Sequence, residues 1–485
     1  MNHLKNLEPG GIWHFFEEIC RIPRISKHED EIKKWLRNFA SGQGLEFRED
    51  EAGNILIIRE ASPGFEKMKC VVLQSHLDMV GEKDSGHPHD WYHDPITPVI
   101  RDGWVTADGT TLGADDGIGI AAQLALLSDR TIKTGRLECL FTVDEETGMT
   151  GAKNISREFI DGRILINLDS EDEGILFIGC AGGIDTVGRM TVKLERMAPG
   201  MTTFRVSLTG LTGGHSGDEI HKGFANSIKQ MARFLSRLSE KYKISLAEFN
   251  GGNLRNGIPR EAFAVIAVNE SDKDQILAEA RHFHTILKEE YGNLDPGIML
   301  EVSPVDYSGS VMNINDRDRL INMLYACPHG VLAWSKDMDD LVETSTNLAI
   351  VKSIGDNEIE IVTTQRSSLE SGKCFAARMV ESCMKLAGAT VTHSEGYPGW
   401  KPDINSEILR ITRASYKKLF GREPEVKAIH AGLECGLFYE KFPGIDMISF
   451  GPTIKGAHTP EERINIETTS MFWELLKDVL RNIPQ

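Results

Sequence analysis

The sequence predicts an α/β protein whose first domain is discontinuous and is interrupted by an inserted domain. Three observations support this fold class. Short β-branched runs alternate with helical stretches in the N-terminal third of the chain, several of these runs are apolar on both faces, and the pattern changes in the middle of the chain and later returns.

The first domain is predicted from its apolar runs. We expect strands at residues 54–59, 70–74, 137–143 and 163–168. A nearly all-apolar helix over residues 118–127 lies between them, which fits a sheet covered on both faces.

The inserted domain begins where this pattern stops, near residue 184. We expect strands at 203–208 and 262–268, an amphipathic helix over 226–238, and a similar order of elements between 331 and 392. A strand at 446–450 and a final helix over 468–480 then complete the first domain. The expected boundaries are 1–183 and 398–485 for the first domain and 184–397 for the insert.

Composition narrows the class of protein. Hydrophobic residues make up 40% of the 485 residues and charged residues 26%, as in ordinary folded chains. With 54 Lys and Arg against 72 Asp and Glu, the net charge of −18 repels polyphosphate, and we find no basic stripe, so no nucleic acid is expected as a partner. The start lacks the pattern of a signal peptide and no apolar stretch approaches ~20 residues, so we expect a cytoplasmic protein without a membrane segment.

Cysteine does not supply a metal site in this sequence. The eight cysteines are scattered without CxxC spacing, which favours reduced, buried thiols over disulfides or a thiolate zinc site. Any metal would therefore be held by His and carboxylate.

Five segments carry the candidate chemistry, and the first contains His76 and Asp78. Residues two apart on a strand share a face, so Asp78 can contact His76 and fix the tautomer of a metal-ligating imidazole. A buried polar pair without a metal is the alternative.

The next three segments supply carboxylates. Asp115 and Asp116 precede the apolar helix, where either could serve as a cap, and their order of importance stays open. Glu145 and Glu146 follow one predicted strand and Asp169 follows another. Neighbouring buried carboxylates repel unless a cation or proton compensates, although a solvated acidic turn would also explain Glu145 and Glu146.

The fifth segment is a glycine-rich loop that carries His458. Two histidines with several acids and no cysteine suit Zn²⁺, Mn²⁺ or Co²⁺. Two such ions would be neutralised by Asp115, Glu146, Asp169 and one hydroxide. Glu145 would then be left to take a proton from the attacking water.

Together these segments resemble the dinuclear zinc peptidase family that includes peptidase V, peptidase T, carboxypeptidase G and the carnosinases. The resemblance covers essentially the whole chain. The phrases HLDMV, GTTLGADDGIG, NGGNLRNGIPREAFA and IHAGLECGLF are similar to those of the Xaa-His dipeptidases within this family. The family resemblance implies a mixed-sheet zinc-peptidase catalytic domain with an inserted α+β lid or dimerisation domain.

The resemblance also implies a ligand set. His76 and Asp169 would hold one metal, Glu146 and His458 the other, and Asp115 would bridge both, followed by a cis peptide bond to Asp116.

Further roles follow from the same resemblance. Asp78 would orient His76, Glu145 would be the general base, and His215 in a GGHSG turn would donate to the oxyanion from the same chain or from a partner copy.

Substrate contacts are expected at three more positions. The resemblance places Asn256 and Arg366 at lid positions that contact substrate, and a guanidinium suits a C-terminal carboxylate. Glu434 departs from the Thr or Asp common in relatives, and we hypothesise that it receives the free ammonium of the substrate, with a loop acid of no special role as the alternative.

The expected activity is a hydrolase, a metal-dependent dipeptidase acting on unblocked dipeptides, notably Xaa-His. It would use two divalent ions, Zn²⁺ first, and could form a homodimer through the lid domain. An N-acyl amino acid amidohydrolase on the same scaffold is the nearest alternative, and a metal-binding protein without catalysis is a more distant one.

Overall fold

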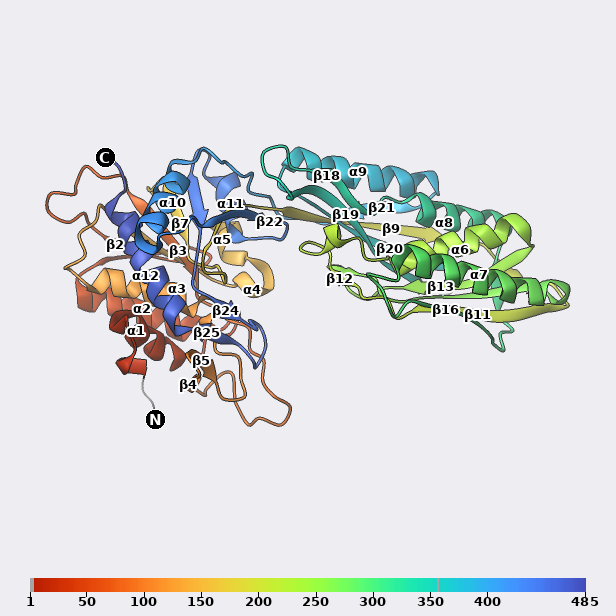
Figure 1. Cartoon of the computed structure of the whole chain (residues 1–485), viewed down its shortest axis with the longest axis horizontal. Coiled ribbons are helices and arrows are strands. Elements are labelled where there is room, and N and C mark those ends of the chain that lie inside the picture. The colour runs from red at the N-terminus through yellow and green to blue at the C-terminus, as the bar shows by residue number, and fades with distance from the viewer. Residues whose placement is uncertain (1–3, 356) are drawn as a thin grey trace. The chain divides into compact units, whose positions relative to one another are not determined.

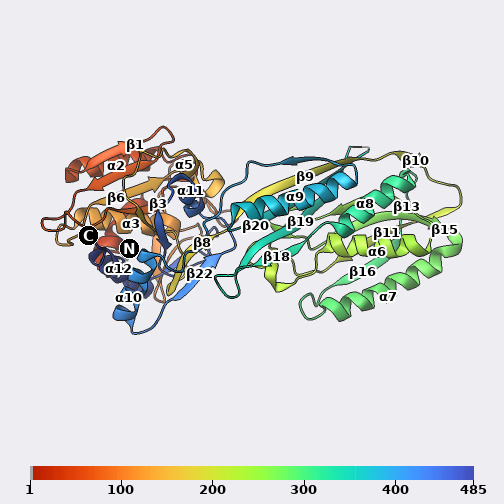
Figure 2. The ribbon, with the colours of Figure 1, turned by 90° about the horizontal axis from the view of Figure 1, so that it is seen from above.

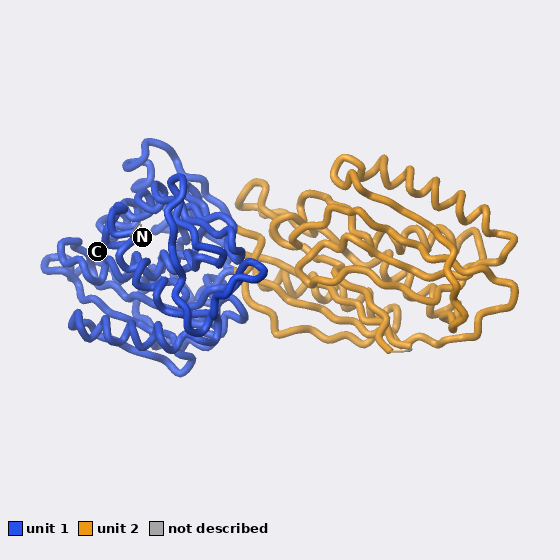
Figure 3. Tube along the Cα trace, turned by 90° about the horizontal axis from the view of Figure 1, so that it is seen from below, with its two compact units in different colours: residues 1–179, 400–428, 433–485 blue, residues 180–399, 429–432 orange. Residues whose placement is uncertain are grey.

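The computed structural model of the chain describes residues 4–355 and 357–485. The chain divides into two compact units (Figure 3). Unit 1 comprises Met1–Gly179, Trp400–Ala428 and Leu433–Gln485, and unit 2 comprises Cys180–Gly399 and Ile429–Gly432. Three short segments that we expected in the first domain group with unit 2 instead, namely residues 180–183, 398–399 and 429–432.

Unit 1 is built on a mixed sheet, and Figure 1 labels its strands β2, β3, β7 and β22. The strand order of the sheet is β1-β2-β6-β3-β7-β23-β8-β22. In this order the strands are β1 (Glu46–Glu49), β2 (Ile55–Arg59), β6 (Leu137–Thr142), β3 (Val71–His76), β7 (Ile164–Asn167), β23 (Asp446–Ser449), β8 (Ile175–Cys180) and β22 (Glu425–Ile429). β3 runs parallel to both β6 and β7, and β23 runs parallel to β7. Because every residue of β2, β3, β6 and β7 is buried, both faces of the sheet are covered, as the apolar runs predict.

Helices pack around this sheet (Figure 2). They are η1 (Leu4–Asn6), α1 (Gly10–Cys20), α2 (Asp30–Gln43), α3 (Ala114–Ser128), α4 (Glu145–Gly148), α5 (Thr150–Asn154), α10 (Glu407–Phe420), α11 (Glu434–Lys441) and α12 (Ile466–Arg481). α3 lies between β3 and α1, while α10 packs on β23 and α12. A smaller antiparallel sheet has the order β24 (Ile454–Lys455), β25 (Arg463–Asn465), β5 (Trp104–Ala107), β4 (Pro98–Arg101).

Unit 2 contains an antiparallel sheet with strand order β16-β11-β15-β13-β19-β20-β9-β21, with β18 beside β19. The strands are β9 (Gly182–Thr191), β11 (Met201–Thr209), β13 (Ile244–Gly251), β15 (Ala262–Asn269), β16 (Met299–Pro304), β18 (Gly330–Trp334), β19 (Val342–Ile354), β20 (Glu358–Ser367) and β21 (Thr390–His393). The helices are η2 (Ile220–Lys222), α6 (Ser227–Lys241), η3 (Glu270–Asp272), α7 (Lys273–Tyr291), α8 (Ile314–Ala326) and α9 (Glu370–Leu386).

The core of unit 2 follows from strand alternation. Phe204, Val206 and Leu208 of β11 are buried in the apolar core, and alternate residues of β15 join them. Successive side chains on a strand point to opposite faces, so these alternate residues share one face of the sheet. Buried residues of α6, α7, α8 and α9 belong to the same apolar core and therefore cover that face. Two short pairs complete the unit, β10 (Leu194–Arg196) with β17 (Ser310–Met312), and β12 (Gly214–His215) with β14 (Gly257–Ile258).

The elements predicted from periodicity are present. The four early strands appear as β2, β3, β6 and β7, the amphipathic helix as α6, and the last strand and helix as β23 and α12. Among the described helices, none is both long and apolar enough to cross a membrane.

The core of unit 2 gives a test of stability. Phe283 on α7 is 1% exposed, and its ring stacks on that of Phe234 with centroids 5.3 Å apart. Phe283→Ala is expected to lower the free energy of unfolding by about 3–5 kcal/mol, because it leaves a cavity in a packed core. Urea denaturation followed by circular dichroism measures the change. The neighbouring exposed substitution His282→Ala should change it by less than about 0.5 kcal/mol, and equal effects would contradict this packing.

Candidate metal centre

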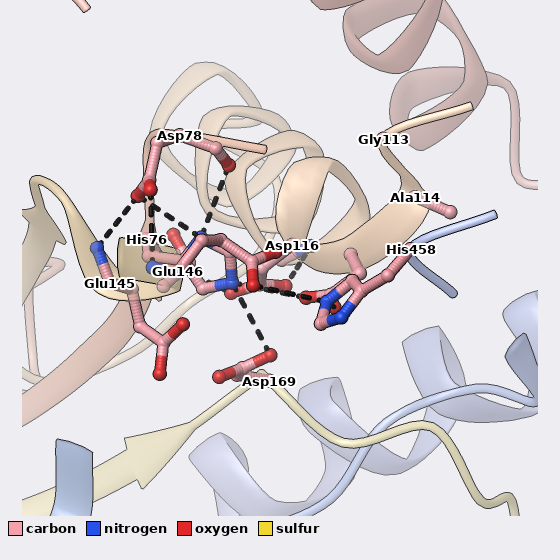
Figure 4. Close-up of polar contacts among 12 residues, drawn as sticks. His76, Asp78, Gly113, Ala114, Asp116, Glu145, Glu146, Asp169 and His458 are labelled. Atoms are coloured by element: carbon pink, nitrogen blue, oxygen red, sulfur yellow. Dashed lines mark hydrogen bonds and ion pairs between the residues drawn. The ribbon is translucent and has the colours of Figure 1, made fainter. Parts of the chain in front are cut away.

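Charged and polar side chains gather at one edge of the sheet in unit 1 (Figure 4). His76 ends β3, Glu145 and Glu146 follow β6, and Asp169 follows β7. These three strands are parallel neighbours, so their carboxyl ends meet at the same edge. The acids that follow separate strands in the sequence therefore form one cluster in space.

Asp115 lies between two histidines. Its Oδ1 is 3.0 Å from Nε2 of His76, and its Oδ2 is 3.1 Å from Nε2 of His458. Nε2 of His458 also lies 3.0 Å from Oε2 of Glu146, and Nε2 of His76 lies 3.6 Å from Oδ1 of Asp169. Each imidazole thus faces Asp115 and one further carboxylate.

Asp115 and Asp116, which the sequence leaves unranked, have different surroundings. The peptide bond between them is cis, as the family resemblance implies. The carboxylate of Asp116 accepts hydrogen bonds from the backbone N–H groups of His76, at 3.3 Å, and Gly119, at 3.1 Å. Asp116 also lies within reach of His76 and Asp169, but only Asp115 faces both imidazoles.

Asp78 contacts Nδ1 of His76, the ring nitrogen that does not face Asp115. Nδ1 of His76 is 3.1 Å from the backbone oxygen of Asp78 and 3.5 Å from its Oδ1, which directs Nε2 toward Asp115. The carboxylate of Asp78 also accepts hydrogen bonds from Ser26 Oγ and from the backbone N–H groups of Glu145 and Glu146, at 2.7, 3.0 and 3.2 Å. Although burial opposes ionisation, the contact with His76 and these hydrogen bonds lower the pKa of Asp78 to about 2.

The cluster carries more negative charge than its protein surroundings offset. Burial, together with nearby carboxylates, raises the pKa of Glu145 well above its usual value and that of Asp169 to about 6. Hydrogen bonds to Asp115 and Glu146 raise the pKa of His458 to about 11. Glu145, Asp169 and His458 therefore hold protons more tightly than they would in water, because neighbouring carboxylates disfavour a further negative charge and favour a positive one.

The donor atoms fit divalent cations. The ligand atoms of Asp115, Glu146 and His458 lie within 4.8 Å of one another, as do those of His76, Asp116 and Asp169. Within residues 4–355 and 357–485, the buried Oε1 of Glu146 has no hydrogen-bond partner. Imidazole nitrogens and carboxylate oxygens suit Zn²⁺, Mn²⁺ or Co²⁺, and each carboxylate oxygen of Asp115 faces one imidazole.

Two buried residues that the sequence analysis does not identify support this cluster. Arg24 donates hydrogen bonds to the backbone oxygens of Leu77 and Asp78, and Glu462 accepts hydrogen bonds from the backbone that precedes Asp115. No spacing or composition signal marks either residue, because their partners are backbone groups from distant segments.

Glu434 begins α11 and is completely buried. Its Oε2 accepts hydrogen bonds from Nε2 of Gln74 and Oγ1 of Thr142, both at 2.7 Å, and burial raises its pKa to about 8. Its Oε1 is buried and has no hydrogen-bond partner in the part of the chain that the structure describes. This placement excludes a solvent-exposed loop acid.

His215 and Asn256 lie close together in unit 2. The pairing of β12 with β14 joins their two turns, and the backbone oxygen of Asn256 accepts a hydrogen bond from Ser216 N at 2.8 Å. His215 is 33% exposed, and its Nδ1 lies 3.1 Å from both the backbone N and Oδ2 of Asp218.

Arg366 belongs to the same unit, on β20. It is buried and donates a hydrogen bond to Tyr397 Oη at 2.8 Å. The hydrogen bond to His215, with further help from the charge of Arg366, lowers the pKa of Asp218. Asp218 therefore contacts His215 directly and is influenced by Arg366 through charge alone.

Two polar residues beside those just described, His430 and Tyr397, are not identified from the sequence. Nε2 of His430 lies 2.7 Å from Ser345 Oγ, and burial lowers the pKa of His430 to about 3. His430 lies within the IHAGLECGLF phrase, but the phrase alone does not indicate its surroundings.

Comparisons with known proteins agree with this picture. The profile of Peptidase family M20/M25/M40 matches residues 72–482. The chain is 43% identical over 484 residues to the cytosol non-specific dipeptidase of Escherichia coli (strain K12), covering 100% of both chains. The structure of the present chain resembles that of aminoacylhistidine dipeptidase from Vibrio alginolyticus. The TM-score is 0.95 at 42% identity, over 99% of this chain and 98% of the other.

A more distant likeness concerns the fold alone. A tripeptidase from Staphylococcus aureus matches with a TM-score of 0.57 at 17% identity, over 98% of this chain and 99% of the other. Together the matches confirm the fold class and the family resemblance that the sequence predicts.

Proposed function

The chain belongs to peptidase family M20/M25/M40 and is a hydrolase, and from this premise we propose that it is a metal-dependent dipeptidase that cleaves unblocked dipeptides, Xaa-His among them. The placement of Asp115 between His76 and His458 carries the proposal, because it lets two cations share one carboxylate. The names of the two relatives, a non-specific dipeptidase and an aminoacylhistidine dipeptidase, support the substrate class.

In this proposal His76 and Asp169 would hold one divalent ion, Glu146 and His458 would hold the other, and Asp115 would serve both. Zn²⁺ is our first choice, with Mn²⁺ and Co²⁺ as alternatives of the same donor preference. When bound, such ions lower the pKa of water and polarise a peptide carbonyl.

The residues of the chain would then divide the work of hydrolysis. Glu145 takes the proton from the attacking water and passes it to the leaving amine. Asp78 keeps Nε2 of His76 directed toward Asp115. His215, from unit 2, donates to the developing oxyanion. Because Asp218 faces Nδ1 of His215, Nε2 is the nitrogen available for this contact. The imidazole would come from the same chain or from a partner copy.

Substrate recognition would use charged groups at both ends of a dipeptide. Arg366, oriented by its hydrogen bond to Tyr397, binds the C-terminal carboxylate, and Asn256 adds a polar contact. Glu434 receives the free ammonium through its Oε1 atom.

Glu145 provides the first test. Glu145→Ala should keep both metals, counted by mass spectrometry of the dialysed protein, and should lower kcat by about 10²–10⁴-fold, the usual contribution of a general base. Glu158→Ala, at an exposed position, is the matched control and should leave kcat unchanged. Loss of metal from the Glu145 variant would instead make Glu145 a ligand.

Substrate choice provides the second test. Release of histidine from a free Xaa-His dipeptide and from its N-acetylated twin is measured with metal-loaded protein, and we expect cleavage of the free dipeptide. Glu434→Gln should raise KM for it by about 10–100-fold, because a hydrogen bond to a charged group contributes about 1.5–3 kcal/mol.

The controls of this assay separate the alternatives. Glu440→Gln, an exposed change on the same helix, should leave KM unchanged. Cleavage of the acetylated twin alone would favour the N-acyl amino acid amidohydrolase and would remove the role given to Glu434.

We also propose a cytoplasmic location, in keeping with the name of the Escherichia coli relative, and a homodimer formed through unit 2. Leu386 on α9 is 89% exposed and Tyr325 on the neighbouring helix α8 is 50% exposed, so both apolar side chains are available to a partner copy. Sedimentation equilibrium should give the mass of a dimer for the intact chain and a lower mass for Leu386→Asp. A monomeric intact chain would contradict this assembly.

A further inference from the structure

We propose that Glu462 is a positioning residue that holds Asp115 in place between the two histidines and so sets metal affinity. The inference rests on the proposed function in one respect, since it takes Asp115 to be the shared ligand.

Glu462 is almost completely buried, with 2% of its surface exposed, and its carboxylate is surrounded by backbone donors. Oε2 accepts hydrogen bonds from Leu112 N at 2.7 Å and Gly113 N at 2.8 Å. Oε1 accepts hydrogen bonds from Ala114 N at 2.7 Å and Asp115 N at 3.2 Å. Each oxygen of one side chain thus binds two consecutive N–H groups of the segment that ends at Asp115.

This segment lacks the hydrogen bonds of a regular helix. Asp115 has φ −81° and ψ 111°, outside the helical region, and Gly113 has φ +69°, which a residue with a Cβ rarely adopts. N–H groups that precede a helix need partners from outside it. The carboxylate of Glu462 accepts hydrogen bonds from four such N–H groups. It therefore fixes the backbone from which the Asp115 side chain projects.

Glu462 also belongs to the loop that carries His458. The two residues are four apart in sequence, and Glu462 N donates a hydrogen bond to the backbone oxygen of Thr459 at 3.0 Å. The backbone oxygen of Glu462 accepts a hydrogen bond from Thr106 Oγ1 at 2.9 Å, which anchors the loop to β5. One short segment therefore positions both His458 and Asp115, whose side chains meet at 3.1 Å.

Arg24 binds the backbone carbonyl groups of the same region. Its guanidinium donates to the backbone oxygens of Leu77 and Asp78, at 2.9 and 2.8 Å, and to that of Gly113. Leu77 and Asp78 directly follow His76. Donors from Arg24 and acceptors from Glu462 thus connect the segment before Asp115 to the segments of both histidines.

A role in positioning makes a different prediction from a role in stability alone. A stabilising cap would change the free energy of unfolding and leave the bound metal unchanged. A positioning residue would change metal affinity and the geometry of the bound ion in protein that remains folded, because partners of ligands orient the ligands.

The experiment compares Glu462→Gln with Glu461→Gln. The amide side chain introduced by Glu462→Gln has nearly the shape of the carboxylate that it replaces, but its nitrogen cannot accept the two N–H groups that one carboxylate oxygen now binds. Glu461 is the exposed neighbour on the same loop, so its substitution removes the same charge without touching these donors. Zn²⁺ affinity is measured by competition with a chromophoric chelator, and the geometry by visible absorption of the Co²⁺-loaded protein.

We expect Glu462→Gln to weaken Zn²⁺ binding by about 10–100-fold and to alter the Co²⁺ spectrum, and Glu461→Gln to match the wild type. Unchanged affinity and spectrum in a folded Glu462→Gln protein would overturn the inference. If that variant does not fold, Glu462→Asp keeps the charge with a shorter reach and is subject to the same criteria. A wild-type protein that binds no metal would refute the proposed function itself, which is a separate outcome.

Discussion

The repulsion among carboxylates at the edge of the unit 1 sheet is the constraint on which the rest of the site depends. Parallel strands bring Glu145, Glu146 and Asp169 to one edge, and Asp115 joins them from the start of α3. Burial makes each negative charge more costly, and the raised pKa values of Glu145 and Asp169 express that cost. Positive charge offsets that cost. The imidazoles of His76 and His458 face these carboxylates, and divalent cations held there would offset the charge further, so the arrangement favours metal binding.

The supporting residues fix the positions and directions of the side chains in this cluster. Asp78 binds the imidazole of His76 and the backbone of Glu145 and Glu146 at once, so it joins β3 to the turn after β6. Glu462 does the equivalent for Asp115 by binding backbone rather than side chain. Both are buried acids whose charge is spread over several hydrogen bonds. The protein therefore adds further negative charge near the site in order to fix geometry, which is tolerable because donors from the backbone surround it.

The sequence predicts the parts of this structure that depend on local pattern. Hydrophobic periodicity identifies β2, β3, β6, β7 and α6, and the acids that follow the apolar runs identify the edge where the cluster forms. The difference between Asp115 and Asp116 could not be predicted from the residues, because both precede the same helix and only backbone conformation separates them. Glu461 and Glu462 are likewise identical in type and adjacent, yet one is exposed and the other buried, since the contacts of Glu462 come from residues about 350 positions away in the chain.

The chemistry of the metal cluster does not select between a dipeptide and an N-acyl amino acid, so selectivity on this proposal lies in the buried charged groups around it. Glu434 has one oxygen bound by Gln74 and Thr142 and another without a hydrogen bond among the described residues. A substrate ammonium would complete its hydrogen bonding, whereas an acyl group would leave a buried carboxylate oxygen unpaired. Because unpaired buried polar groups cost more than an additional contact gains, preference for a free amino terminus would arise mainly from the penalty on blocked substrates.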